Sequence, residues 1–277
     1  MKTVVIKLGG SAIQNDTVIV QLGHLIKDYK KQGYQVTLIH GGGPEINQAL
    51  IEKGIQWQFI NGQRQTTPEM MTVIEDVLFH KINKRVQSHL KKLNIDAVSL
   101  SGKNHQLLVC EIFQPELICV GKVVEVNSTL LRRLFIDNPQ VVPIISPIGC
   151  LVNDTTTSLN INADWAAVQI AIALKADKLL FLTDQDGVWN ENKKTISMTD
   201  PFHLEKLIAN DVIQGGMMTK VRTMIHGIEN GIGEIRVIHA QKAVNLIEEP
   251  FLGTQIVAMT PDKQVSTNST FKENYHG

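Results

Sequence analysis

Short apolar runs alternate with longer amphipathic segments along most of the chain. Six of these runs are rich in Val, Ile and Leu and hold few polar residues, which is typical of strands buried on both faces of a sheet. They cover residues 3–8, 35–40, 97–100, 141–145, 178–182 and 234–239. The runs therefore predict the strands of a central sheet.

Amphipathic segments between these runs predict helices. They cover residues 17–31, 45–53, 68–93, 129–137, 163–174, 203–210 and 217–230. Gly33, Gly54 and Gly231 lie just past the ends of three of them, where glycine commonly terminates a helix. The alternation of strands and helices predicts an α/β protein, a three-layer αβα sandwich with a mainly parallel central sheet.

Two segments interrupt this alternation. Residues 56–66 carry Asn61-Gly62 between residues of strand character, which is the strongest short signal for a hairpin. Residues 107–127 indicate a further pair of strands. We expect both pairs to be antiparallel additions to the main sheet, near the rim of a site.

No repeat and no low-complexity linker divides the chain, so any two halves would form one continuous sheet. We place the N-terminal half at residues 1–174 and the C-terminal half at residues 175–259. Residues 260–277 are rich in Ser, Thr, Asn and Lys and predict a flexible tail.

The composition is that of a globular protein with a substantial core, since 43% of the 277 residues are hydrophobic and 19% are charged. Lys plus Arg and Asp plus Glu number 27 each, so no basic excess indicates a nucleic-acid partner. The three cysteines are widely spaced and form no CxxC pair, which predicts neither a disulfide framework nor a metal site of the protein's own. These cysteines are Cys110, Cys119 and Cys150.

Polar and helix-breaking residues interrupt the apolar runs that could enter a membrane. Lys7 and two glycines break the first run, so no signal peptide is expected. Pro143, Pro147 and Gly149 break the longest later run, so no membrane span is expected. We therefore expect a cytoplasmic protein.

Two glycine-rich segments, Lys7-Leu8-Gly9-Gly10-Ser11 and His40-Gly41-Gly42-Gly43-Pro44, follow the first two predicted strands. Ligands gather at strand ends in open α/β sheets, where glycine N–H groups, a lysine and a helix N-terminus can bind a phosphate. The first segment is as compatible with an ordinary turn that carries a surface lysine as it is with a phosphate-binding site. Three consecutive glycines in the second favour an anion site, and we interpret His40 as a packing or hydrogen-bonding residue.

Three further segments are polar. Asn160, Asn162 and Asp164 would form one wall of a site if their segment is extended, but Asn162 or Asp164 could instead cap the helix that follows. The other two segments are each compatible with ordinary turns. They are Thr183-Asp184-Gln185-Asp186-Gly187-Val188 and Gly215-Gly216-Met217-Met218-Thr219-Lys220.

The Walker pattern GxxxxGK[ST], the GxGxxG fingerprint and the HRD/DFG set of protein kinases are absent. Taken together and in order, the five segments resemble the amino acid kinase family from Lys7 to Gly253-Thr254. The match rests most specifically on Asn61-Gly62-Gln63-Arg64, Asn160-Ile161-Asn162-Ala163-Asp164 and Gly216-Met217-Met218-Thr219-Lys220. The resemblance implies the amino acid kinase fold.

The same resemblance implies a role for individual residues. Lys7 and Lys220 would stabilise the transferring phosphoryl group, and Asp164 would hold both lysines in place. Gly42, Gly43, Arg64 and Asn160 would bind the acceptor. The implied ATP-binding residues are Gly9, Gly10, Asp184, Gln185, Asp186, Gly187, Val188, Trp189, Val212, Ile213, Gln214 and Gly216.

The activity that the resemblance implies is ATP-dependent phosphorylation of the side-chain carboxylate of N-acetyl-L-glutamate in arginine biosynthesis, with Mg²⁺ bound to ATP. The N-terminal half would bind the acidic amino acid and form a homodimer, and the C-terminal half would bind ATP. One alternative is a family member acting on aspartate, glutamate, an aminoadipate derivative, carbamate or UMP. The other is a non-catalytic amino-acid or nucleotide sensor, against which the presence of both Lys7 and Lys220 argues.

Overall fold

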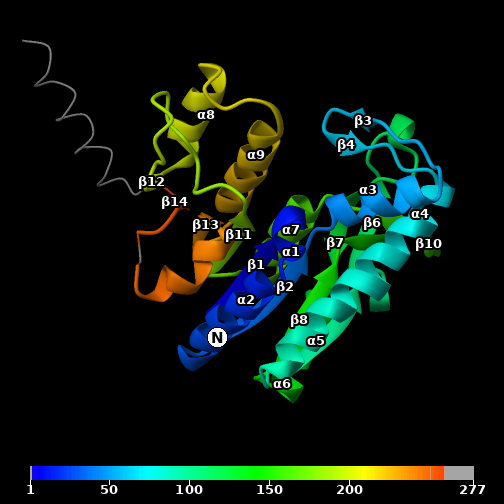
Figure 1. Cartoon of the computed structure of the whole chain (residues 1–277), viewed down its shortest axis with the longest axis horizontal. Coiled ribbons are helices and arrows are strands. Elements are labelled where there is room, and N and C mark those ends of the chain that lie inside the picture. Colours follow the sequence, from blue (N-terminus) through cyan, green and yellow to red (C-terminus); the bar gives the residue numbers. More distant parts are fainter. Residues whose placement is uncertain (1, 250, 259–277) are drawn as a thin grey trace, which may run out of the picture.

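An eight-stranded sheet forms the centre of the molecule (Figure 1). The structure is a computed structural model that describes residues 2–249 and 251–258. The strand order is β12-β14-β13-β11-β1-β2-β8-β5, and neighbouring strands are parallel except β13 with β14. The six predicted strands are confirmed, each within one residue at either end. The strands are β1 (Lys2–Leu8), β2 (Tyr34–His40), β5 (Ala97–Ser101), β8 (Val142–Ser146), β11 (Lys178–Thr183), β12 (Met198–Thr199), β13 (Glu234–His239) and β14 (Thr254–Ile256).

Helices cover both faces of this sheet, which confirms the predicted αβα sandwich. One face packs against α2 (Asp16–Lys31), α3 (Gly43–Glu52), α4 (Pro68–Glu75) and α5 (Lys84–Lys92). The opposite face packs against α6 (Ser128–Asp137), α7 (Ala163–Leu174), α8 (Pro201–Ala209) and α9 (Gly215–Glu229). The short helix α1 (Gly10–Ile13) and the 3₁₀ segments Asn104–Gln106, Pro115–Leu117 and Ala240–Ile247 were not predicted.

The predicted helix 68–93 is continuous but not uniform. Between α4 and α5, residues Asp76–Asn83 form a π-helix, in which the backbone hydrogen bonds skip one residue more than in an α-helix. Such wider turns are rare and often lie beside functional sites. Leu78 and Ile82 of this segment pack next to the second glycine-rich segment.

The two predicted hairpins exist but do not extend the main sheet, so that prediction is wrong. Residues 107–127 give the antiparallel strands β6 (Leu108–Ile112) and β7 (Gly121–Val126). These two strands join β9 (Ile148–Leu151) and β10 (Asp154–Asn160) in a separate sheet of order β10-β9-β6-β7, because the chain leaving β8 returns to pair with β6. The hairpin of β3 (Phe59–Ile60) and β4 (Gln63–Arg64) forms a sheet of its own.

The pleat of β1 decides which helices Lys7 faces. Val4, Ile6 and Leu8 pack in the core beneath α2, whereas Val5 packs in the core beneath α7 and α9. Side chains two residues apart on a strand point to the same face, so Lys7 lies on the side of Val5. The amine of Lys7 is therefore directed toward α7 and α9.

Within residues 2–249 and 251–258, no helix is both long enough and apolar enough to cross a bilayer. The predicted flexible tail, residues 260–277, lies outside the described residues.

Candidate active site

The two glycine-rich segments lie against each other at the ends of β1 and β2. A Cβ atom added to Gly10 would lie 3.0 Å from the backbone nitrogen of Gly43, and one added to Gly41 would lie 3.0 Å from that of Gly10. Real Cβ atoms rarely come so close to backbone atoms. Glycine at these positions lets the two backbones approach closely, and their N–H groups are gathered at one place.

The carboxylate of Asp164 lies between two lysine amines that come from distant parts of the chain. Asp164 Oδ1 is 2.7 Å from Lys7 Nζ, and Asp164 Oδ2 is 2.6 Å from Lys220 Nζ. Lys7 is the penultimate residue of β1, Asp164 lies in the first turn of α7, and Lys220 lies on α9. The structure thus brings together all three predicted catalytic residues.

Burial and charge act against each other in this triad. The side chains of Lys7, Asp164 and Lys220 are only 8%, 15% and 17% exposed. Burial lowers the pKa of Lys7, and Asp164 partly opposes this while Lys220 adds to it. Burial would raise the pKa of Asp164, but the two ammonium groups outweigh it and hold that pKa far below its usual range. Asp164 is therefore ionised at neutral pH, and one positive charge of the triad remains uncompensated.

A pocket of about 420 Å³ opens beside the triad, and we call it the glycine-loop pocket. All of the predicted catalytic and acceptor-binding residues except Lys220 line it, namely Lys7, Gly42, Gly43, Arg64, Asn160 and Asp164, and so does Gly10, which was predicted to bind ATP. These residues come from the first two strand ends, the β3–β4 hairpin and the β10–α7 connection. An acidic small molecule in this pocket would meet cations, glycine N–H groups and an amide.

Arg64 is held on several sides and keeps one donor free. The side-chain oxygen of Asn47 accepts a hydrogen bond from Arg64 Nη2, and the guanidinium carbon lies 5.2 Å and 4.9 Å from the ring centroids of Trp57 and Phe59. Arg64 Nη1 is buried and has no hydrogen-bond partner among the described residues. A buried donor without a partner is costly, so this nitrogen is available for a ligand carboxylate.

Sequence reasoning missed the residues that hold Arg64. Trp57 and Phe59 precede it on the hairpin, and Asn47 lies on α3. Alternating aromatic residues before an arginine could have indicated stacking, because guanidinium groups favour aromatic faces. Asn47 gave no local signal, because its contact depends on where α3 places it.

The segment 160–164 follows the capping interpretation rather than the extended one. Asn162 Oδ1 accepts hydrogen bonds from the backbone N–H groups of Asp164 and Trp165 and so caps α7. The segment is therefore not extended as far as Asp164, which already belongs to the helix, but Asn160, Asn162 and Asp164 all line the glycine-loop pocket. Asn160 ends β10 and donates to Thr66 Oγ1 at 3.1 Å.

His40 is a buried hydrogen-bonding residue, as interpreted from the sequence. Its Nδ1 donates to the Gly41 carbonyl at 2.9 Å, and its Nε2 lies 3.1 Å from Asn83 Nδ2. Burial lowers the pKa of His40 to about 4, so the ring is neutral at pH 7. His40 thus ties the second glycine-rich segment to the π-helix.

The predicted ATP-binding residues do not line one common pocket: Gly9 and Gly10 follow β1, and the others lie in the C-terminal half. Val188 and Ile213 are buried in the core, and Gln214 precedes α9 as its N-cap residue. Asp186 pairs with Lys242 at 2.6 Å. Asp184 acts electrostatically on Lys7, and the backbone N–H of Gly9 donates to the Leu182 carbonyl. Gly187 is buried, Gln185 and Val212 are half-buried, and Trp189 is exposed.

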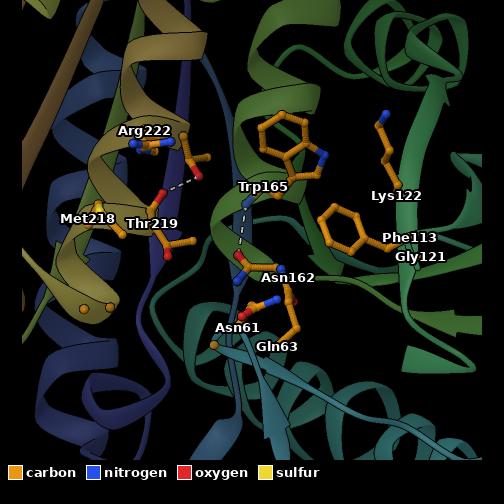
Figure 2. A pocket seen from close by; sticks show the side chains of 14 residues that line it. Asn61, Gln63, Phe113, Gly121, Lys122, Asn162, Trp165, Met218, Thr219 and Arg222 are labelled. Carbon is orange, nitrogen blue, oxygen red and sulfur yellow. Dashed lines mark hydrogen bonds between the residues drawn. The ribbon is translucent and has the colours of Figure 1, made fainter. Parts of the chain in front are cut away.

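A second, larger hollow lies beside the glycine-loop pocket, between α7, α9 and β7 (Figure 2). Of the predicted residues it includes Gly216, and it also includes Asn162, which follows Asn160 on the way into α7. We call it the α7–α9 hollow. Its volume is about 720 Å³.

The strand order, the paired glycine-rich segments and the two lysines on one aspartate define a class of protein. The model of the amino acid kinase family matches residues 2–239. The chain belongs to the amino acid kinase family.

Acetylglutamate kinases are among the relatives of this chain. The chain is 37% identical over 235 residues to acetylglutamate kinase of Paracoccus denitrificans, covering 85% of this chain and 76% of that protein. It is 35% identical over 257 residues to acetylglutamate kinase of Bacillus subtilis, covering 92% and 96%. Among solved structures, smu.665 of Streptococcus mutans is similar, with a TM-score of 0.79, 27% identity, and coverage of 93% of this chain and 99% of that one.

Proposed function

We propose that this chain transfers the γ-phosphoryl group of ATP to the side-chain carboxylate of N-acetyl-L-glutamate, giving N-acetyl-L-glutamyl 5-phosphate in arginine biosynthesis. The observation that carries the proposal is the carboxylate of Asp164, which lies 2.7 Å and 2.6 Å from the amines of Lys7 and Lys220 at the edge of the glycine-loop pocket. The acetylglutamate kinases to which the chain is similar over most of its length support the choice of acceptor.

The acceptor carboxylate needs no general base. An ordinary side-chain carboxyl group has a pKa of about 4, so it is already ionised at neutral pH. The obstacle is the repulsion between this anion and the negatively charged γ-phosphate. Phosphoryl transfer is accordingly catalysed by positioning and by charge stabilisation, which Lys7, Lys220 and the glycine N–H groups would supply.

Asp164 would act on the two lysines and not on the substrate. Lys7 is buried, and its pKa is lowered by that burial. A neighbouring carboxylate favours the charged form of an amine, so Asp164 opposes the loss of the proton from Lys7. It also fixes the distance between two like charges that would otherwise repel each other.

Arg64 would bind the α-carboxylate of the acceptor, and Asn160 its neighbouring polar groups. A guanidinium group can hold a carboxylate through two parallel hydrogen bonds, and Arg64 Nη1 is free to make one of them. Gly42 and Gly43 would donate backbone hydrogen bonds to substrate oxygens. The acceptor would then lie with its side chain toward Lys7.

ATP would lie on the C-terminal half, near Asp184–Trp189 and Val212–Gly216, with Mg²⁺ bound to its phosphates. Among residues 2–249 and 251–258, no cluster of three or more His, Cys, Asp or Glu side chains is placed to hold a metal ion by itself. Mg²⁺ supplies positive charge at the phosphates when bound. The homodimer and the cytoplasmic location stay predictions.

Trapping of the acyl phosphate tests the proposed function. With ATP, Mg²⁺ and hydroxylamine, we expect a hydroxamate when N-acetyl-L-glutamate is the acceptor and much less with L-glutamate, L-aspartate, carbamate or an N-acylated aminoadipate. Hydroxamate formed preferentially with another acceptor would transfer the activity to that compound. No hydroxamate and no ADP with any acceptor would refute a catalytic function.

A further inference from the structure

The α7–α9 hollow has two facing walls. Figure 2 shows Phe113 and Lys122 on one wall, Met218, Thr219 and Arg222 of α9 on the other, and Trp165 between them. Asn61, Gln63 and Asn162 lie together at the lower end of this view, and Gln63 and Asn162 also line the glycine-loop pocket. The hollow is large enough for a small organic molecule.

Positive charge in this hollow is not balanced. Its lining contains Lys122 and Arg222 but no Asp or Glu. Neither cation has an ion pair or a hydrogen bond in the part of the chain that the structure describes, whereas Lys7, Lys220, Lys178 and Lys242 each contact a carboxylate. The N-terminus of α9 also opens here at Gly215 and Gly216, and its N-cap Gln214 makes no capping hydrogen bond. The hollow therefore favours an anion.

An aromatic wall accompanies this charge. The ring of Trp165 stacks on His226 at 4.9 Å with an interplanar angle of 30°, so its orientation is fixed from behind. Trp165 Nε1 is buried and has no partner among the described residues. Phe113, which is 40% exposed, adds a second apolar surface. A ligand here would meet a fixed N–H donor beside apolar rings.

The side chains that form the walls of the hollow lie outside the triad, although Gly216, one of the predicted ATP-binding residues, also lines the hollow. Asp164 lines the glycine-loop pocket and pairs with Lys220. Trp165, one residue after Asp164, and Arg222, two residues after Lys220, line the hollow. Successive helical residues are turned by roughly 100°, so these side chains leave on different faces. Only Gly62, Gln63 and Asn162 line both cavities.

We propose that the α7–α9 hollow binds a small organic anion with a flat apolar body, whose negative group lies near Lys122 and Arg222 and whose body lies against Trp165 and Phe113. The occupant would contact α7 beside Asp164 and α9 beside Lys220. Because those two helices set the distance between Asp164 and Lys220, binding in the hollow changes turnover. The effect on turnover rests on the proposed function, and the binding does not.

The binding is tested with 8-anilinonaphthalene-1-sulfonate, which has a flat aromatic body and one sulfonate. Titration followed by fluorescence is made on the full-length protein and on Lys122→Gln, Arg222→Gln and Arg133→Gln. Arg133 is the matched control, because it is an exposed arginine on α6 outside the hollow. We expect Kd to rise about fivefold or more in the first two variants and to stay unchanged in the third. Equal Kd in all four proteins would overturn the proposal.

Competition and kinetics separate the hollow from the substrate sites. We expect the dye to remain bound at saturating ADP and N-acetyl-L-glutamate, and displacement by either compound would overturn a separate site. We also expect the dye to change the rate at saturating ATP and acceptor in the unmodified protein and in Arg133→Gln, but much less in Arg222→Gln. Binding without any change in rate would refute the coupling to turnover and leave the binding site standing.

Discussion

Asp164, Lys7 and Lys220 form an arrangement whose value lies in chemistry more than in stability. Removing charged groups from water is costly, and a buried ion pair often contributes little or nothing to the free energy of unfolding. Here two ammonium groups surround one carboxylate, so a net positive charge stays at the edge of the glycine-loop pocket. That charge suits a site for an anionic transition state.

Lys220→Ala removes one of these two charges. We expect kcat to fall about a hundredfold or more, because a preorganised charge on the transferring group is lost. The KM values should change less than kcat. Coupled measurement of ADP release gives the rate, and circular dichroism with a melting curve shows whether the variant is folded. A folded variant with near-normal kcat would remove Lys220 from the mechanism.

Arg64→Lys keeps the positive charge but removes the planar fork. We expect KM for N-acetyl-L-glutamate to rise about tenfold or more while KM for ATP changes little. Lysine cannot make two parallel hydrogen bonds, and it lacks the planar group that lies within 5.2 Å of the rings of Trp57 and Phe59. Initial rates with each substrate varied in turn provide the test. Equal increases in both KM values would count against an acceptor-binding role.

At the scale of elements, the π-helix and the second glycine-rich segment act as one unit. Leu78 and Ile82 fill the space where a side chain on Gly42 would lie. Asn83, at the end of the π-helix, lies 3.1 Å from His40 Nε2 and 3.0 Å from the Ile144 carbonyl. The wider helical turns thus bring apolar and polar groups of one segment to the same strand end.

Gly42→Ala tests this unit. The new Cβ would lie 2.5 Å from Ile82 Cδ1 and 2.7 Å from Leu78 Cδ2, in a region where both side chains are buried. We expect the free energy of unfolding to fall by about 1–3 kcal/mol, as is usual for overpacking, and KM for the acceptor to rise. Urea unfolding measures the first quantity and initial rates the second.

Gly43→Ala is the matched control, since a Cβ there meets no atom within 4 Å. It should leave the free energy of unfolding nearly unchanged. Ile82→Val removes one of the two methyl groups that would collide, Ile82 Cδ1, so it should restore part of the stability lost in Gly42→Ala. If Gly42→Ala and Gly43→Ala are equally stable, the π-helix does not constrain the glycine-rich segment.

Local patterns predicted the main strands and helices because burial on both sheet faces and amphipathic spacing are encoded within each segment. Pairing between segments is a non-local property, so residues 107–127 were predicted as strands but assigned to the wrong sheet. The same distinction holds at the site. Lys7, Lys220, Asp164, Arg64 and their neighbours could be named from ordered motifs. Asn47, the π-helix and the α7–α9 hollow depend on packing that no short motif contains.

At the scale of the whole molecule, the order of the strands explains how distant residues meet. β1 lies between β11 and β2 in the centre of the sheet, with β13 beyond β11 (Figure 1). The helices that carry Asp164 and Lys220 both pack on the face that receives Lys7. A central parallel strand with helices on that face therefore brings residues 7, 164 and 220 to one strand end.

The stability of the whole molecule should depend on pH through His40, which joins this sheet to the helices. Burial lowers its pKa to about 4, whereas an unfolded histidine has a pKa of about 6.5. Between these values the unfolded chain binds a proton that the folded chain does not, so His40 stabilises the fold fully above pH 6.5 and progressively less as the pH falls toward 4. We expect this group to lower the free energy of unfolding by about 2 kcal/mol between pH 7 and pH 5.

Urea unfolding at both pH values, compared with His40→Gln, isolates the effect, because other titrating groups are common to both proteins. His24→Gln, which changes an exposed histidine on α2, should keep the full decrease. An equal decrease in His40→Gln would show that His40 is not the group that links folding to pH.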